Sequence, residues 1–297
     1  MSIQERRELF KNKVLNKGVI LPGAYNALSA LQVEQTGFDG IYISGAALSA
    51  CAGLPDIGLL NLSEFSFFIK YITQAVKIPC IADSDTGFGD VVNVSRTIKE
   101  LESIGLFGIH IEDQEMPKRC GHLKGKKLVS EEEMIRKIQT ACISRKDSNF
   151  LIIARTDARA VEGIDEAIKR ALSYVKAGAD AIFPEALKTK EEFEVFAKEV
   201  NAPLLANMTE FGVSPLLSSK ELFSMGYKLI IFPVTALRVA MKNTKALYEE
   251  IKQKGTQLAY LKSMQTRDEL YDLIKYDSYA ELDHKVANYK NKSDESK

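Results

Sequence analysis

The 297-residue sequence predicts an α/β protein in which eight parallel strands form a (β/α)8 TIM-type barrel. Eight short apolar runs alternate with amphipathic segments. The runs are almost continuous in Ile, Val, Leu and Phe, which is typical of strands buried on both faces. A doubly wound open sheet is the alternative, and eight strands in a chain of this length favour the barrel. The strands are predicted over 19–25, 40–45, 78–83, 108–112, 150–155, 181–185, 203–207 and 229–234.

Capping patterns predict helices between these strands. Asn61 precedes an acidic first turn, Ser130 begins a Ser-Glu-Glu-Glu capping box, and Gly178 is placed to end a helix. The helices are predicted over 61–76, 93–104, 130–145, 165–177, 189–200 and 214–225. An N-terminal helix over about residues 3–15 would cap the barrel, and two or three extra helices reach about residue 289.

No linker rich in Pro, Gly or Ser divides the chain, so we expect one domain over 1–290 and a polar, disordered tail over 291–297. The surplus C-terminal helices indicate packing on another subunit.

Composition limits the classes of partner. Lys+Arg and Asp+Glu each total 40, so the chain lacks the basic excess of a nucleic-acid-binding protein. We find no signal-peptide pattern and no apolar run approaching the ~18–20 residues of a membrane span. The four cysteines form no CxxC pair and are expected to be reduced thiols of a cytoplasmic protein.

Acidic side chains end three of the predicted strands. Asp83 and Asp85 end the third, His110 and Glu112 share one side of the fourth, and Glu185 ends the sixth. Carboxylate oxygens at the carboxyl ends of barrel strands suit Mg²⁺, whereas the ligand spacing of a zinc site is absent. The alternative is that these acids are solvated loop residues that cap the next helices.

Basic and amide side chains reach the same predicted edge. Arg155 ends the fifth strand, Asn207 and Thr209 close the seventh, and Arg238 follows the eighth. Together they favour a polycarboxylate ligand, although each Arg could instead pair with a helix acid. The small residues around Gly45 would let backbone N–H groups approach an anion, or would simply form a tight turn.

A long polar loop between the fourth strand and the helix at Ser130 contains the segment Lys-Arg-Cys-Gly-His, residues 118–122. Such a loop is typical of an active-site lid. The cationic neighbours of Cys120 are expected to lower the pKa of its thiol for proton transfer. The alternative, a cysteine that only fills apolar space, fits these polar neighbours poorly.

This segment, continued by Leu123, resembles the signature hexapeptide of the isocitrate lyase and phosphoenolpyruvate mutase superfamily. The stretches at 83–87 and 207–210 are also similar to that family, and the resemblance covers residues 6–289. The chain lacks the insertions of true isocitrate lyases and in this resembles methylisocitrate lyases. The resemblance implies Mg²⁺, with Mn²⁺ as a substitute, and a homotetramer in which neighbours exchange a C-terminal helix.

The resemblance also implies residue roles. Metal-site residues would be Asp83 and Asp85, with Glu112 through waters and Asp56 in support. Cys120 would be the general acid, Tyr42 a candidate base, and His110 a further catalytic residue. Substrate would contact Ser44, Gly45, Ala46, Cys120, Gly121, Arg155, Glu185, Asn207, Met208, Thr209, Arg238 and Arg267. Phe183, Ile231 and Pro233 resemble a pocket for the substrate methyl group.

The implied reaction is cleavage of the tricarboxylate (2R,3S)-2-methylisocitrate to pyruvate and succinate, as in propionate catabolism by the methylcitrate cycle. Isocitrate cleavage, an oxaloacetate decarboxylase-like activity and phosphonopyruvate processing are rivals within the superfamily. A non-catalytic barrel that binds tricarboxylates, or an inactive structural oligomer, are rivals from other classes.

Overall fold

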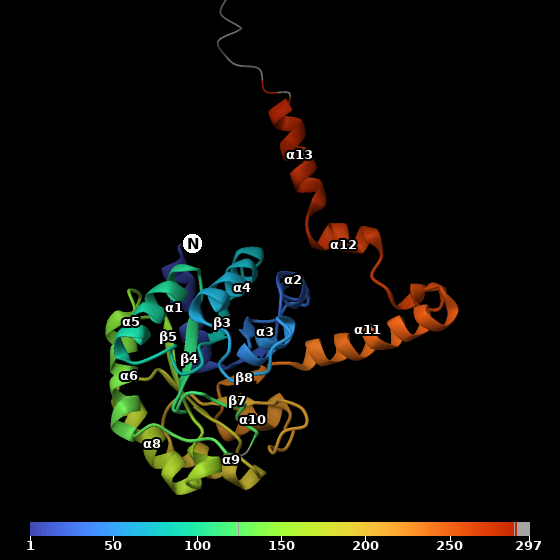
Figure 1. The fold of residues 1–297 in the computed structure, drawn as a ribbon. Helices are drawn as coiled ribbons and strands as arrows, with labels where there is room; N and C mark the ends of the chain where they lie inside the picture. Colours follow the sequence, from blue (N-terminus) through green and yellow to red (C-terminus); the bar gives the residue numbers. More distant parts are fainter. Residues whose placement is uncertain (124, 288, 290–297) are drawn as a thin grey trace, which may run out of the picture. The chain divides into compact units, whose positions relative to one another are not determined.

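The computed structural model describes residues 1–123, 125–287 and 289. The chain divides into two compact units, Met1–Val239 and Ala240–Lys297. In the first unit, parallel strands are surrounded by helices, as Figure 1 shows. The α/β class predicted from the sequence is thus confirmed. The prediction of one domain over 1–290 stays a prediction, and the whole of the expected tail, 291–297, lies outside the described residues.

Each predicted strand is present, with ends that differ by up to three residues. Five strands pair in the order β2-β3-β4-β5-β6 and three in the order β1-β8-β7, all in parallel. They are β1 (Val19–Pro22), β2 (Ile41–Ile43), β3 (Cys80–Asp83), β4 (Gly108–Glu112), β5 (Leu151–Thr156), β6 (Ala181–Pro184), β7 (Leu205–Asn207) and β8 (Leu229–Phe232).

The two sheets meet at two places through isolated parallel bridges. Gly23 bridges to Tyr42 between β1 and β2, and Ile182 bridges to Leu204 between β6 and β7. Single backbone hydrogen bonds of 3.0 Å (Ala24 N–H to Tyr42 O) and 2.9 Å (Ile182 N–H to Pro203 O) lie at these places. A continuous ladder through the eight described strands is therefore absent, and the closed barrel stays a prediction.

The predicted helices are present, and three short helices were not predicted: α2, α3 and α7. The helices of the first unit are α1 (Ile3–Asn16), α2 (Ala27–Gln35), α3 (Gly45–Cys51), α4 (Leu62–Ala75), α5 (Val91–Ser103), α6 (Glu131–Ser144), α7 (Ala158–Val161), α8 (Ile164–Lys176), α9 (Lys190–Glu199) and α10 (Ser219–Met225). Helix α11 (Thr235–Lys254) begins in this unit. The 3-10 helix η1 (Leu258–Ser263), α12 (Arg267–Leu273) and α13 (Tyr276–Ala287) follow in the second.

Capping chemistry fixes several of these helix ends. Asn61 forms a full capping box with Glu64, and Gly178 adopts a left-handed φ of 110° after α8. At Ser130 only half of the predicted capping box is present. The Ser130 hydroxyl accepts from Glu133 N–H, but the Glu133 side chain does not accept from Ser130 N–H. Helix α10 begins at residue 219 rather than 214, because Ser218 supplies its N-cap.

The apolar core has two parts. In the smaller part, strand side chains on one face of the sheets, such as Leu151 and Ile231, pack with Phe107 and with Phe10 and Val14 of α1. The opposite faces pack against the surrounding helices in a larger cluster that includes Phe65, Phe196 and Tyr227. Burial on both faces explains the near-continuous apolar strands.

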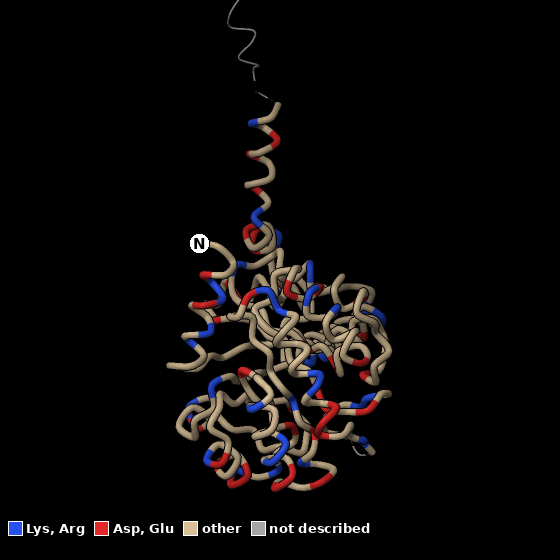
Figure 2. Tube along the Cα trace, turned by 90° about the vertical axis from the view of Figure 1, so that its left-hand side faces the viewer, with Lys and Arg blue, Asp and Glu red and all other residues tan. Residues whose placement is uncertain are grey.

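Lys and Arg alternate with Asp and Glu along the trace, and Figure 2 shows no face of a single sign in its view. No helix of the described residues has the length and apolarity needed to cross a membrane. All four cysteines are free.

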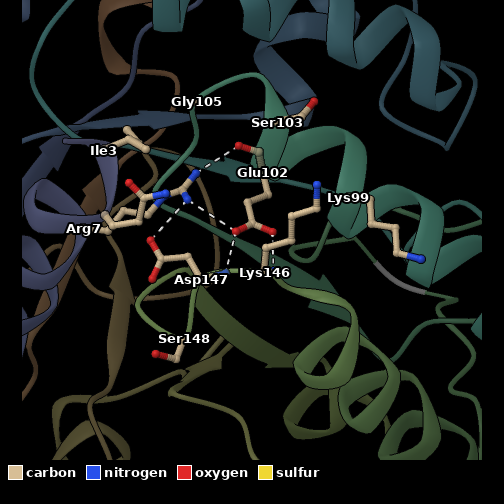
Figure 3. A pocket seen from close by; sticks show the side chains of 10 residues that line it. Ile3, Arg7, Lys99, Glu102, Ser103, Gly105, Lys146, Asp147 and Ser148 are labelled. Carbon is tan, nitrogen blue, oxygen red and sulfur yellow. Dashed lines mark hydrogen bonds and ion pairs between the residues drawn. The ribbon is translucent and has the colours of Figure 1, made fainter.

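Arg7 joins α1 to the end of α5 and to the loops that precede β4 and β5. Its guanidinium donates to the carbonyls of Leu106 and Glu102 and lies 3.4 Å from Glu102 Oε1 and 3.3 Å from Asp147 Oδ2. Figure 3 shows this group beside a surface cavity of about 600 Å³. The three side chains are at most 7 % exposed. Removing one partner of such a buried pair leaves uncompensated charge.

We therefore predict that Arg7→Met lowers the free energy of unfolding by about 3–5 kcal/mol. The matched control is Lys13→Met on the same helix, whose pair with Asp39 is 43 % and 37 % exposed and should contribute less than about 1 kcal/mol. Urea unfolding followed by circular dichroism measures both. Equal effects of the two substitutions would contradict the structural role of Arg7.

Candidate active site

A cavity of about 90 Å³ lies where the strands β2 to β8 end and their following loops begin. Carboxyl ends of parallel strands are where α/β proteins bind ligands. The lining side chains are Tyr42, Ser44, Ala46, Asp56, Asp83, Lys118, Cys120, Gly121, His122, Arg155, Phe183, Glu185, Asn207, Thr209, Pro233, Val234 and Arg238. Residues from seven separate strand–loop connections thus share one small space, as the sequence predicted.

Asp83 connects β3 to its neighbours. Its Oδ2 accepts from Gly45 N–H at 3.2 Å, and its Oδ1 lies 3.6 Å from His110 Nε2. A Cβ on residue 45 would lie 2.8 Å from Asp83 Oδ2, so glycine is needed for this approach. Tyr42 Oη lies 2.6 Å from His110 Nε2. Burial lowers the pKa of His110 to about 4, so the imidazole is neutral at pH 7.

Lys118 places its ammonium among acids. Its Nζ lies 2.8 Å from Asp85 Oδ1 and also contacts Asp56 Oδ1. Burial, with Lys118 opposing it, raises the pKa of Asp85 to about 7. Glu112 and Asp85 outweigh the burial of Lys118 and hold its pKa well above the usual value, so it stays charged. From the sequence, Lys118 was expected only to be a cationic neighbour of Cys120.

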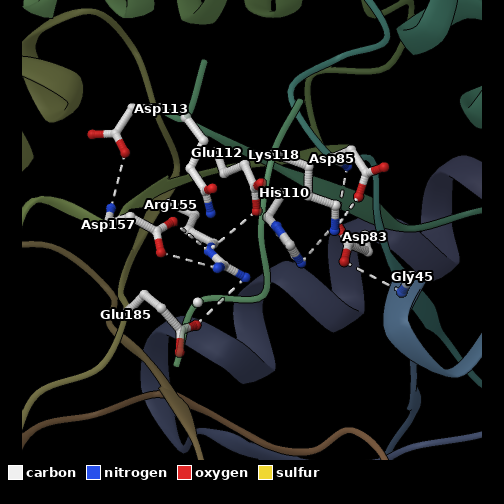
Figure 4. Close-up of polar contacts among 12 residues, drawn as sticks. Gly45, Asp83, Asp85, His110, Glu112, Asp113, Lys118, Arg155, Asp157 and Glu185 are labelled. Carbon is white, nitrogen blue, oxygen red and sulfur yellow. Dashed lines mark hydrogen bonds and ion pairs between the residues drawn. The ribbon is translucent and has the colours of Figure 1, made fainter. Parts of the chain in front are cut away.

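Arg155 lies among three carboxylates at the ends of β4, β5 and β6, as Figure 4 shows. Its Nε is 2.9 Å from Asp157 Oδ2 and 3.4 Å from Glu112 Oε2, and its Nη1 is 3.5 Å from Glu185 Oε2. The guanidinium also stacks over Phe183 at 5.1 Å from the ring centroid. Burial opposes ionisation of Asp157, but Arg155 holds its pKa well below the usual range.

Glu112 is the acid that these cations satisfy least. Both its carboxylate oxygens are buried without a hydrogen-bond partner, and burial raises its pKa well above the usual value. A buried carboxylate without hydrogen bonds is costly, even with Arg155 Nε 3.4 Å away, and indicates a missing partner. No three His, Cys, Asp or Glu side chains of the described residues form a ready ligand cage. Mg²⁺ needs only one or two direct carboxylates with waters, so these residues fit it.

The loop between β4 and α6 carries Cys120 to this cavity. Gln114 bridges to Leu128 at the loop base and exchanges two 2.9 Å hydrogen bonds with the Arg119 backbone. At the tip, a Cβ on Gly121 would lie 2.4 Å from Arg155 Nη2 and 2.5 Å from Glu185 Cγ. The loop backbone therefore lies directly on the charged groups of β5 and β6, in the position expected of a lid.

His122 continues the contact. Its Nδ1 accepts from Val213 N–H at 3.1 Å, which assigns the ring proton to Nε2. Nε2 lies 2.8 Å from Glu185 Oε1, at an angle outside hydrogen-bond geometry. Glu185 also accepts from Asn207 Nδ2 at 3.4 Å. His122 was noted in the sequence only as a neighbour of Cys120.

The expected low pKa of Cys120 is wrong. Burial raises the pKa of this thiol above 9, and the His122 backbone N–H opposes burial only in part. The neighbouring Lys118 contacts Asp56 and Asp85 rather than the sulfur. The thiol is consequently protonated at neutral pH, which suits a proton donor.

Most predicted site residues line the cavity or contact residues that do. Asp85, Glu112, His110 and Gly45 lie behind the lining. Met208 does not line it: its sulfur accepts from Leu217 N–H, within the larger apolar cluster that packs against the surrounding helices. Ile231 belongs to the apolar cluster that packs with Phe10 and Val14 of α1. Arg267 begins α12 in the second unit, and its substrate role stays a prediction.

The comparisons agree with this geometry. The family model of phosphoenolpyruvate phosphomutase matches residues 10–252. The chain belongs to this family. This chain is 50 % identical to 2-methylisocitrate lyase of Aeropyrum pernix, over 95 % of its own length and 90 % of that protein.

Solved structures of the phosphomutase family are similar over nearly the whole chain. A crystal structure of 2,3-dimethylmalate lyase matches with a TM-score of 0.89 and 32 % identity, covering 96 % of each chain. Phosphonopyruvate hydrolase in complex with oxalate and Mg²⁺ matches with a TM-score of 0.85 and 30 % identity, over 97 % of this chain and 99 % of that one.

Because Gly121 touches Arg155 and Glu185, we predict that Gly121→Ala loosens the lid without unfolding the protein. The clash costs about 1–3 kcal/mol, which shifts lid docking about 5- to 150-fold. Trypsin should then cut at Arg119 and Lys127 faster by a comparable factor, as mass spectrometry of the fragments would show. Leu123→Ala, at a lid residue that is 58 % exposed, is the control and should be cut at the wild-type rate.

Proposed function

We propose that this protein is a Mg²⁺-dependent lyase that cleaves 2-methylisocitrate to pyruvate and succinate. The observation that carries the proposal is that the lid thiol of Cys120 lines the same cavity as Asp83 and Asp56. A proton donor and a carboxylate site for a divalent cation thus meet in one small space. The 50 % identity to a protein named 2-methylisocitrate lyase supports this substrate over others in the family.

Asp83, Asp85 and Glu112 would hold the cation, largely through waters, with Asp56 in support. The unpartnered oxygens of Glu112 and the raised pKa of Asp85 support this assignment, since a cation would relieve both. When bound, Mg²⁺ supplies Lewis-acid polarisation of the substrate hydroxyl and its neighbouring carboxylate. Mn²⁺ prefers similar oxygen ligands and would substitute for it.

The substrate carboxylates need hydrogen-bond donors and positive charges inside the cavity. Arg155, Arg238, Asn207 and Thr209 line it and would bind them, with Ser44 and Ala46 on the side of the pyruvate half. Glu185 would hold Arg155, His122 and Asn207 in place rather than meet the anion directly.

Cleavage of the C–C bond requires a base to accept the proton of the substrate hydroxyl, whose carbon becomes the carbonyl of pyruvate, and it leaves a carbanion next to a carboxylate. Cys120 would protonate this carbanion and become a thiolate, and the proton taken from the hydroxyl would then return to the sulfur to complete the turnover. The raised pKa of the thiol keeps the proton on sulfur until the carbanion forms. Burial and Asp83 raise the pKa of Tyr42 well above 10, so Tyr42 is neutral and suited to donating a hydrogen bond. A base role for Tyr42, the hypothesis from the resemblance, would need the tyrosinate that this environment disfavours.

The methyl group of the substrate would contact Phe183 and Pro233, which line the cavity. Ile231 does not line it and would contribute only by packing in the same apolar cluster as Phe183. A pocket for one methyl group gives about 1–3 kcal/mol of discrimination, so isocitrate should be a poor substrate rather than an excluded one.

The direct experiment offers the purified protein 2-methylisocitrate, isocitrate or oxaloacetate with Mg²⁺ and measures pyruvate, glyoxylate and succinate separately. Equal amounts of pyruvate and succinate from 2-methylisocitrate are expected, with turnover abolished by EDTA and restored by Mg²⁺. Glyoxylate as the main product, or pyruvate from oxaloacetate alone, would assign a different family activity. Tight binding without product would indicate a sensor.

We predict that Cys120→Ala lowers kcat by about 10²- to 10⁴-fold, the usual contribution of a general acid. The thermal unfolding midpoint and the Mg²⁺ affinity, measured by calorimetry, should match those of the wild type. Cys142→Ala is the matched control, because that thiol lies on α6 and contacts Gly178 O. Wild-type turnover in Cys120→Ala would exclude the acid role.

We also propose a homotetramer with exchanged C-terminal helices. In the second unit, α13 buries none of its residues, and apolar side chains on α12 and α13 are 40–71 % exposed: Tyr271, Tyr276, Tyr279 and Leu282. Such a surface favours coverage by another copy. Sedimentation equilibrium should give four times the 33.1 kDa chain mass.

Three further proposals continue expectations from the sequence. The two isolated bridges between the sheets support closure of the eight strands into one barrel. We propose that residues 1–290 act as one domain around that barrel. The four free cysteines agree with a reducing, cytoplasmic location.

A further inference from the structure

Lys126, near the end of the lid, is buried although it belongs to a lysine-rich stretch. Its side chain is 1 % exposed, whereas the adjacent Lys127 is exposed. A buried ammonium is stable only when its hydrogen bonds are satisfied. Lys126 Nζ donates to the carbonyl of Gly121 and to Asp157 Oδ1, the latter at 2.8 Å.

Asp157 serves the lid and the active site at once. It occupies the N-cap position of α7, yet its side chain makes no capping hydrogen bond. Its oxygens instead accept from Arg155 Nε at 2.9 Å, from Arg155 Nη2 at 3.2 Å and from Lys126. Its backbone N–H donates to Asp113 Oδ1 at 2.9 Å, which fixes the peptide that carries the side chain.

Both contacts of Lys126 lead to reacting groups. The Gly121 carbonyl belongs to the residue after Cys120, so fixing it fixes the segment that carries the thiol. Asp157 fixes the orientation of Arg155, whose remaining nitrogen lies 3.5 Å from Glu185. A single buried carboxylate therefore connects the docked lid to the guanidinium that faces the cavity.

We propose that Lys126 and Asp157 are positioning residues that form a latch: the pair holds the lid closed with Cys120 in place and sets the orientation of Arg155. The catalytic consequence rests on the lyase function proposed above, whereas the closure itself does not.

The test compares Lys126→Met with Lys127→Met in the full-length protein. The two substitutions remove the same charge from adjacent residues, but only the first removes the contacts to Gly121 and Asp157. Lid closure is measured without substrate, as the rate at which iodoacetamide alkylates Cys120, resolved from the other cysteines by peptide mass spectrometry. Turnover of 2-methylisocitrate with Mg²⁺ is measured in parallel, as separate kcat and KM values.

In Lys126→Met we expect Cys120 to be alkylated faster and kcat to fall, each by about 10- to 150-fold, the usual effect of losing a hydrogen bond to a charged group. The KM should change less than kcat, because Arg155 keeps its two bonds to Asp157. Asp157→Asn weakens both contacts and should raise KM as well as lower kcat. The double variant should lose less than the product of the two single losses, since one interaction is shared.

Equal alkylation rates in Lys126→Met, Lys127→Met and the wild type would overturn the latch. So would a fall in activity that only follows a lower unfolding midpoint, because that effect is structural. If the wild type does not cleave 2-methylisocitrate, the proposed function fails, while the alkylation rates still decide whether the lid is latched.

Discussion

The site depends on one cation, the guanidinium of Arg155, which lies within 3.5 Å of carboxylates from the ends of three adjacent strands. Parallel pairing of β4, β5 and β6 brings Glu112, Asp157 and Glu185 together. Arg155 opposes the effect of burial and holds the pKa values of Asp157 and Glu185 below their usual range, whereas burial still raises the pKa of Glu112. The guanidinium also lies over the ring of Phe183, 5.1 Å from its centroid. Arg155 thus allows two of these three carboxylates to be charged although they are buried.

The lid docks on the acidic residues of the site by charge. Three of its cationic or imidazole groups reach separate acids: Lys118 reaches Asp56 and Asp85, His122 reaches Glu185, and Lys126 reaches Asp157. These contacts explain why the basic residues around Cys120 do not lower the pKa of its thiol. Lys118 and Lys126 already form ion pairs with Asp56, Asp85 and Asp157. An isolated Lys-Arg-Cys-Gly-His segment would suggest the opposite, because sequence shows neighbours but not distant partners.

Features that depend on local sequence could be predicted, whereas contacts between residues distant in the sequence could not. The strand predicted over 108–112 coincides with β4, because a buried parallel strand is apolar almost throughout and its end is marked by Glu112. Strand order then places the acids at one edge. The pairing of Lys126 with Asp157 joins residues 31 apart, and a lysine-rich loop resembles a solvated one. Helix α3 was missed because its seven residues are too few to show helical periodicity.

Lid docking also prepares the thiol for its proposed step. A general acid must keep its proton until the carbanion forms, and burial beneath the docked lid is the largest cause of the raised pKa of Cys120. The lid residues Lys118, Cys120, Gly121 and His122 also line this cavity of about 90 Å³, and closing a site limits the access of water, a competing proton source. Docking therefore both delivers the sulfur and keeps it protonated. A thiolate produced by cationic neighbours would be a better nucleophile, but it would have no proton to donate.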